Sequence, residues 1–135
     1  MSEDLIRRAL AFAHGPSDIS DDALAEVYAP DAVLDMSARV FNPKAYRGYA
    51  GLREYREDLY ETWDDVVFDA EEIIEEGEHA LVMSRMRGRG RASGVPIDEV
   101  GAGIWTVRDG RIVRHRFLGQ IERQEALAVL RAQSR

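Results

Sequence analysis

Apolar residues recur at helical spacing in several separate stretches of the chain. The positions i, i+3 and i+4 are apolar on one face, which is typical of helices that pack on a core. Gly15 and Pro16 should end the first of these helices. Ser20 is a plausible N-cap, and Pro30 should end the helix that follows it because proline disfavours a helical residue before it. This spacing predicts helices over residues 3–14, between Ser20 and Pro30, from about Leu52 to Trp63, and over about 122–132.

Between these helices, and through most of the second half of the chain, apolar and polar residues alternate with the period of two that is typical of strands. Asp109-Gly110 predicts a tight hairpin between the last two strands. Residues 39–50 read as an ordered loop. The alternation predicts strands over residues 32–38, 66–75, 79–91, 98–108 and 111–118. This order predicts one α+β domain over residues 1–135, with its helices on one face of an antiparallel sheet.

Strand parity separates two faces of the predicted sheet. On strand 79–91, Ser84 and Met86 share a face with apolar neighbours, and four arginines share the opposite face. On the last strand, His115 and Phe117 share a face. Trp105, on the strand before, has the parity of Gly101 and Gly103, which leave room for a ligand or mark sheet curvature.

Composition narrows the function classes. The chain has 135 residues, no cysteine and a formal net charge of −7. A negative balance of this size disfavours binding to nucleic acid. The charged N-terminal stretch is not typical of a secretory signal, and no segment is apolar enough to span a membrane. We therefore expect a cytoplasmic protein.

Three segments resemble those of a known superfamily. YAPDAVLDM (28–36), YRGYAGLREY (46–55) and VRDGRIVRHRF (107–117), the last followed by a helix with the letters EAL, are similar to segments of the nuclear transport factor 2-like superfamily. The chain looks most like the SnoaL-like group, named for polyketide cyclases. The resemblance implies a cone-shaped cavity between a curved antiparallel sheet and helices packed on its concave face. The superfamily includes isomerases, hydrolases, cyclases, dehydratases and binding-only subunits.

The resemblance and the parity together predict a cavity. Its expected lining is Tyr28, Leu34, Met36, Tyr55, Ser84, Met86, Glu99, Trp105, His115 and Phe117. The familiar catalytic sets are absent. Met36 stands where ketosteroid isomerases carry their aspartate, and Ser84, Met86 and Phe117 stand where epoxide hydrolases carry their catalytic residues.

His115 is the titratable group that we expect on the cavity face, where it could act as an acid or base near neutral pH. The alternative is a hydrogen-bonded core histidine. Glu99 could pair with it at the cavity mouth or could be a solvated strand end. Tyr28 and Tyr55 could be packing residues or ligand contacts.

These residues predict a SnoaL-like protein that binds a small, largely apolar organic molecule. If the protein is an enzyme, we expect a cofactor-free isomerase, cyclase or dehydratase that uses proton transfer through His115. The alternative is a non-catalytic ligand-binding or dimeric interaction module. No metal site is expected, because the three histidines lack ligand spacing.

We make two further predictions about side chains on the outer face of the sheet. The arginines should pair with acids on strand 66–75, with Asp69 as the partner of Arg85, which argues against a nucleic-acid site. Apolar side chains with outward parity need cover, and a second copy of the chain would supply it. These side chains are Leu81, Met83, Ile104 and Leu118. A homodimer is therefore expected, as the superfamily resemblance also implies.

Overall fold

A computed structural model describes residues 2–14 and 18–133 of the chain, so Gly15 and Pro16, the predicted end of the first helix, lie outside the described residues. Its helices are α1 (Ser2–Ala11), a short 3-10 helix η1 (Phe12–His14), α2 (Asp21–Ala25), α3 (Gly48–Thr62) and α4 (Arg123–Gln133). Its strands are β1 (Tyr28–Asp35), β2 (Ala45–Arg47), β3 (Trp63–Glu76), β4 (His79–Gly90), β5 (Pro96–Arg108) and β6 (Arg111–Gly119). Across the described ranges, no helix is long and apolar enough to cross a membrane.

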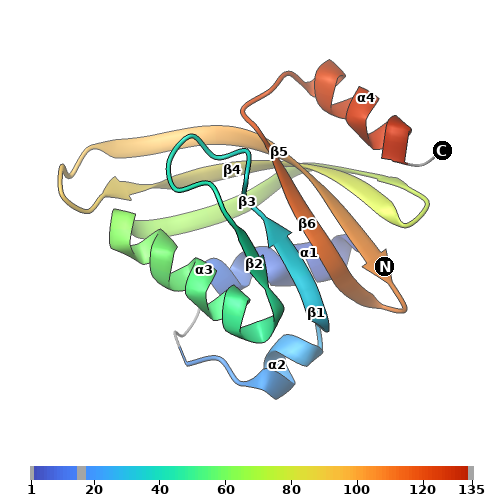
Figure 1. Cartoon of the computed structure of the whole chain (residues 1–135). Coiled ribbons are helices and arrows are strands. Elements are labelled where there is room, and N and C mark those ends of the chain that lie inside the picture. Colours follow the sequence, from blue (N-terminus) through green and yellow to red (C-terminus); the bar gives the residue numbers. More distant parts are fainter. Residues whose placement is uncertain (1, 15–17, 134–135) are drawn as a thin grey trace.

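The strands form one curved, six-stranded sheet in the order β2-β1-β6-β5-β4-β3 (Figure 1). β3 to β6 make the predicted antiparallel meander, and β1 joins it by pairing parallel to β6. Asp109 and Gly110 have φ angles of 53° and 75°, the left-handed values that a type I′ hairpin requires at both central residues. The predicted α+β fold with a curved sheet is confirmed.

The helices do not all lie on one face of the sheet. α1 and α3 cover the concave face, where their apolar side chains join a core that contains Val82 and Trp105. α4 packs on the opposite face, against Leu81 and Ile104 (Figure 1). The expectation that every helix covers the concave face is wrong for α4, because Leu127 and Leu130 bury the outward apolar residues of β4 and β5.

That position of α4 also removes the sequence argument for a dimer. Leu81 and Ile104 are 0% and 3% exposed within this single chain. Met83 and Leu118 pack at the edge of the same cluster. The outward apolar side chains are therefore covered by the chain itself and need no second copy.

The first half of the chain departs from the predicted boundaries. Ser20 caps α2 as expected, but the helix ends at Ala25, and Tyr28 already begins β1. Pro30 lies inside β1, in the stretch where the pairing with β6 is irregular, and such a position tolerates a residue without an N–H donor. The stretch 39–50, predicted as a loop, contains β2 and the first turn of α3.

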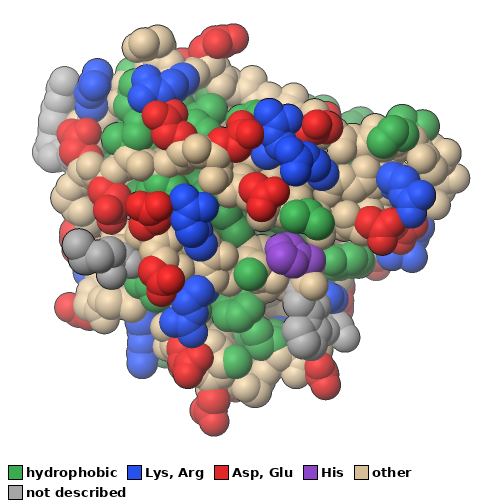
Figure 2. Space-filling view, turned by 180° about the vertical axis from the view of Figure 1, so that it is seen from behind, with side chains coloured by type: hydrophobic (Ala, Val, Ile, Leu, Met, Phe, Trp, Pro, Cys, Tyr) green, Lys and Arg blue, Asp and Glu red, His purple; other side chains and the backbone are tan. Residues whose placement is uncertain are grey.

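The arginine face of β4 is paired with acids on both neighbouring strands. Arg85 contacts Glu71 Oε2 at 2.8 Å and Asp98 Oδ1 at 2.6 Å, and Arg87 lies 3.6 Å from Asp69. The prediction of pairing with β3 is correct, and Asp69 lies opposite Arg85 in the register, but the ion pair of Arg85 is formed with Glu71, the extra residue of a bulge between Ala70 and Glu72. Figure 2 shows acidic and basic side chains interspersed over one side of the molecule.

Candidate functional site

A cavity with two adjoining parts lies between the concave face of the sheet and helices α1 and α3. The outer part has a volume of about 180 Å³ and the inner part about 50 Å³. Leu10, Tyr55, Phe68 and His115 belong to the walls of both parts, so the two parts adjoin at these side chains. An engineered apolar cavity of about 150 Å³ holds a benzene molecule. The space therefore suits a molecule of one or two rings.

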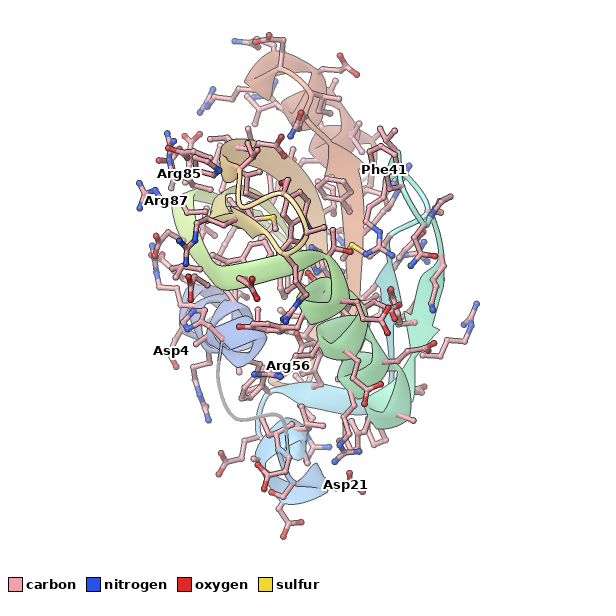
Figure 3. The ribbon with its side chains drawn as sticks, turned by 90° about the vertical axis from the view of Figure 1, so that its left-hand side faces the viewer. Asp4, Asp21, Phe41, Arg56, Arg85 and Arg87 are labelled. Atoms are coloured by element: carbon pink, nitrogen blue, oxygen red, sulfur yellow. The ribbon has the colours of Figure 1, made fainter. Side chains whose placement is uncertain are left out.

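The structure places all ten sequence-predicted residues in the walls of this cavity. The inner part is lined by Tyr28, Leu34, Tyr55, Trp105 and His115. The outer part is lined by Met36, Tyr55, Ser84, Met86, Glu99, His115 and Phe117. Arg85 and Arg87 point away from the interior of the curved sheet, whereas Arg56 lies between α1 and α3 (Figure 3). The parity of β4 therefore separates cavity residues from surface residues.

Gly101 and Gly103 of β5 make room for the rings of neighbouring residues on β6. A Cβ atom at Gly101 would lie 2.9 Å from Phe117 Cε1, and one at Gly103 would lie 3.1 Å from His115 Nε2. β6 pairs with β5 so that these rings lie over the glycines. Gly101 and Gly103 also line the outer part of the cavity, so the space that they leave is shared between these rings and the cavity.

His115 lies flat against Trp105 at the junction of the two cavity parts. The ring centroids are 3.8 Å apart and the planes differ by 17°. Within the described ranges, the imidazole neither donates nor accepts a hydrogen bond, so the partner expected to fix its tautomer is not found. Burial lowers the pKa of His115 to about 3.

This pKa determines what His115 can do. At neutral pH the ring is uncharged, so one nitrogen donates a hydrogen bond and the other accepts one. General acid–base catalysts work best with a pKa near the operating pH, and His115 is far below that range. In this state His115 can bind and orient a polar atom of a ligand more readily than it can exchange protons with it.

Tyr28 and Tyr55 place protonated hydroxyl groups on the cavity wall. Burial raises the pKa of Tyr55 to about 12, and burial also raises the pKa of Tyr28. The Tyr55 ring makes an edge-on contact with the Tyr46 ring, with centroids 5.5 Å apart. Both hydroxyls can therefore donate a hydrogen bond to a ligand at any pH at which the protein is studied.

The outer part holds further polar side chains, two of which the sequence did not indicate. Ser84 is half-buried and Glu99 is exposed. Arg39 and Gln120 also line this part. Both lie outside the predicted helices and strands, where no periodicity tells which way a side chain points. Across residues 2–14 and 18–133, no group of three or more His, Asp or Glu side chains is arranged to hold a metal ion.

The family follows from a comparison of the sequence with known families. The model of the SnoaL-like domain matches residues 6–115. This chain belongs to the SnoaL-like family. The resemblance seen in the sequence is therefore confirmed. No curated protein matches the chain significantly.

Solved structures with the same fold cover nearly the whole chain. A protein with a ketosteroid isomerase-like fold from Catenulispora acidiphila, in complex with trimethylamine, is 14% identical, with a TM-score of 0.73 over 96% of this chain and 94% of that one. A protein from Jannaschia sp. CCS1, assigned as a SnoaL-like polyketide cyclase, is 20% identical, with a TM-score of 0.70 over 98% and 91%. TerC, co-crystallised with polyporic acid, is 17% identical, with a TM-score of 0.69 over 96% of each chain.

Proposed function

We propose that this SnoaL-like protein binds a small, largely apolar organic molecule in the cavity between its sheet and helices. The observation that carries the proposal is the composition of the walls. Apolar and aromatic side chains from α1, α3 and five strands surround a few separate polar groups, which is typical of small-molecule sites. The apolar walls would hold the carbon skeleton, and the polar groups would orient it.

His115 and the tyrosines give this ligand its expected polar contact. A neutral imidazole and the hydroxyl of Tyr55 are both donors beside the junction of the two cavity parts. An oxygen of the ligand at that point would accept from one or both. A carbonyl compound of one or two rings therefore fits the site better than a pure hydrocarbon.

Two of the structural neighbours support ligand binding by this fold. One was crystallised in complex with trimethylamine and another with polyporic acid. Their sequence identities of 14% and 17% carry no information on which molecule this chain holds. They support only the expectation that the space between sheet and helices is a ligand site.

A matched pair of variants on β4 tests the proposal. Ser84→Leu adds an apolar side chain to the cavity wall, whereas Arg87→Leu adds the same side chain on the outer face of the same strand. We expect acetophenone or 1-tetralone to raise the melting temperature of the wild type and of Arg87→Leu, but not that of Ser84→Leu. Equal stabilisation of all three proteins would show that the ligand binds elsewhere, and no stabilisation of any would contradict the proposal.

Cofactor-free proton transfer, as in an isomerase, cyclase or dehydratase, is the second candidate. It is favoured by the presence of Glu99 and Ser84 in the same cavity as His115. The test is deuterium exchange at the carbon next to the carbonyl of bound 1-tetralone in heavy water, followed by NMR. Exchange that is faster than without protein and is lost in His115→Gln or Glu99→Gln would support catalysis. If 1-tetralone binds but its deuterium exchange is not accelerated, the protein binds this ligand without catalysing proton transfer.

Assembly and location remain proposals. We propose a homodimer, which now rests on the superfamily resemblance alone because α4 covers the outward apolar residues. Sedimentation at micromolar concentration tests it, and a monomer would contradict it. The cytoplasmic location stays a prediction from the sequence.

A further inference from the structure

Arg39 brings a positive charge into the wall of the outer cavity. Its side chain is half-buried and lies among apolar and aromatic groups. In the described part of the chain, no carboxylate forms an ion pair with its guanidinium. Arginines of this kind are normally neutralised, because a partly buried charge without a counter-charge destabilises the folded protein.

The guanidinium is held in place by neutral oxygen atoms. Its Nη2 atom donates to the carbonyl of Asn42 at 2.7 Å and to the hydroxyl of Tyr46 at 2.9 Å. Tyr46 in turn donates to Asp58 Oδ2 at 2.6 Å, and Lys44 forms the ion pair with that carboxylate at 3.0 Å. Lys44 also pairs with Glu54 at 2.8 Å, so the two carboxylates share one lysine, and Arg39 is linked to Asp58 only through the hydroxyl of Tyr46. Tyr46 therefore acts as the fixed support of Arg39.

Most donors of Arg39 remain unused. A guanidinium has five N–H groups, and the two contacts of Nη2 account for two, which leaves three on Nε and Nη1. Nε is shielded from solvent and has no hydrogen-bond partner among the residues that the structure describes. A planar cationic group with free donors and no direct carboxylate contact is suited to an anionic oxygen.

We propose that Arg39 binds an acidic oxygen of the cavity ligand, so that the ligand is a small, largely apolar organic acid with a carboxylate, phenolate or enolate group. The inference rests on the proposed function of the cavity and narrows its ligand class. The apolar walls hold the rings, and Arg39 with its support from Tyr46 holds the anionic end at the outer part.

Glu99 is the charged group that opposes this arrangement. It lines the same outer part of the cavity, and its carboxylate would repel an anionic ligand. Glu99 is exposed, so solvent screens this repulsion. Removing its charge should therefore strengthen the binding of an acid by a few-fold, and it should leave the binding of a neutral analogue unchanged.

Cinnamate and cinnamamide test the proposal, since they share a skeleton and differ in charge. We expect calorimetric titration to show that Arg39→Gln weakens the binding of cinnamate by about 10- to 100-fold, the range of a charge-assisted hydrogen bond, and changes the binding of cinnamamide little. Arg87→Gln, which removes the same charge from the outer face, should leave both affinities unchanged.

Three further variants distinguish the effect of the charge of Arg39 from the effect of its hydrogen bond to Tyr46. Arg39→Lys should recover part of the affinity for cinnamate. Tyr46→Phe keeps Arg39 but removes its support, so it should weaken cinnamate binding less than Arg39→Gln does. Glu99→Gln should strengthen cinnamate binding. Melting temperatures of all variants show whether each one is folded.

The outcomes distinguish this inference from the function on which it rests. If the wild type binds cinnamamide as tightly as cinnamate, or if Arg39→Gln weakens both equally, the anion site is wrong and the apolar cavity stands. If neither compound binds the wild type but 1-tetralone does, the anion site is wrong and the apolar cavity stands. If none of the three compounds binds, both proposals are overturned.

Discussion

At the scale of single residues, the stacking of His115 on Trp105 has a consequence for stability. Burial holds the pKa of His115 at about 3 in the folded protein, against 6.5 for the ordinary side chain. Below pH 6.5 the unfolded chain takes up a proton on His115 that the folded chain does not. The folded protein should therefore lose stability as the pH falls from about 6.5 to about 3, by up to about 1.4 kcal/mol per pH unit from this group.

A pair of variants isolates this contribution from that of the carboxylates, which titrate in the same range. His115→Phe keeps a flat ring against Trp105 and removes the titration, so its stability should fall less steeply with acid. His14→Gln, at an exposed position, is the control for the loss of a histidine elsewhere in the chain. Chemical denaturation at several pH values measures all three, and parallel curves for wild type and His115→Phe would show that His115 is not the group responsible.

The face on which a side chain lies was largely predictable for residues on regular strands, and it was not predictable for residues on loops. Parity alone placed Ser84, Met86 and His115 on the concave side, because alternate side chains of a strand must point to opposite faces. Arg39 follows the end of β1 and precedes β2, where the backbone has no fixed period. The hydrogen bonds that aim it come from Asn42 and Tyr46, and no pattern in the sequence reveals such contacts.

At the scale of elements, the close approach of α3 to β2 depends on Gly51. A Cβ atom at this position would lie 2.9 Å from the backbone carbonyl carbon of Tyr46, and a backbone atom cannot move aside easily. Alanine favours a helix over glycine by about 1 kcal/mol, but overpacking of this kind costs about 1–3 kcal/mol. We expect Gly51→Ala to destabilise the protein in chemical denaturation.

The neighbouring exposed position gives the control. Ala50→Gly changes helix propensity in the opposite direction at an exposed position, so it should cost at most about 1 kcal/mol. A gain of stability in Gly51→Ala would show that propensity outweighs the contact between α3 and β2.

The attachment of α4 to the convex face leads to a second prediction at this scale. Leu130 is 0% exposed and packs with Leu81 and Ile104. Leu130→Ala should therefore reduce the free energy of unfolding by about 2–5 kcal/mol, the range for truncation of a buried leucine. Ala128→Ser, at an exposed position of the same helix, should change it by no more than about 0.5 kcal/mol. A small effect of Leu130→Ala would mean that α4 contributes little to the stability of the sheet.

The elements themselves were predictable where their periodicity was long. The meander from β3 to β6 and the helices α1, α3 and α4 all appear near their predicted positions. The side on which α4 packs was missed, because an amphipathic helix fits either apolar face of a sheet. β2 was missed because its three residues are too few to show an alternation.

At the scale of the whole molecule, many charged side chains form ion pairs, and the arginines of β4 do not make a purely positive surface. The arginines of β4 lie between acids of β3 and β5, and charged side chains of both signs alternate over the surface in Figure 2. Each exposed pair contributes only about 0–1 kcal/mol to stability. Their larger effect is to cancel the positive potential that the arginine-rich sequence would otherwise create.

This cancellation, with a net charge of −7, predicts that the protein does not bind nucleic acid at physiological salt. Fluorescence anisotropy with labelled single- and double-stranded DNA and with RNA measures this directly. Arg87→Ala removes one arginine from the paired face and is the matched variant, because its side chain is exposed and its loss should not unfold the sheet. A nucleic acid that bound the wild type and was released by Arg87→Ala would show that this face is a binding surface, whatever its pairing in the free protein. Binding that appeared only at low salt and was unaffected by Arg87→Ala would reflect weak, non-specific attraction to phosphates, which falls steeply as salt rises.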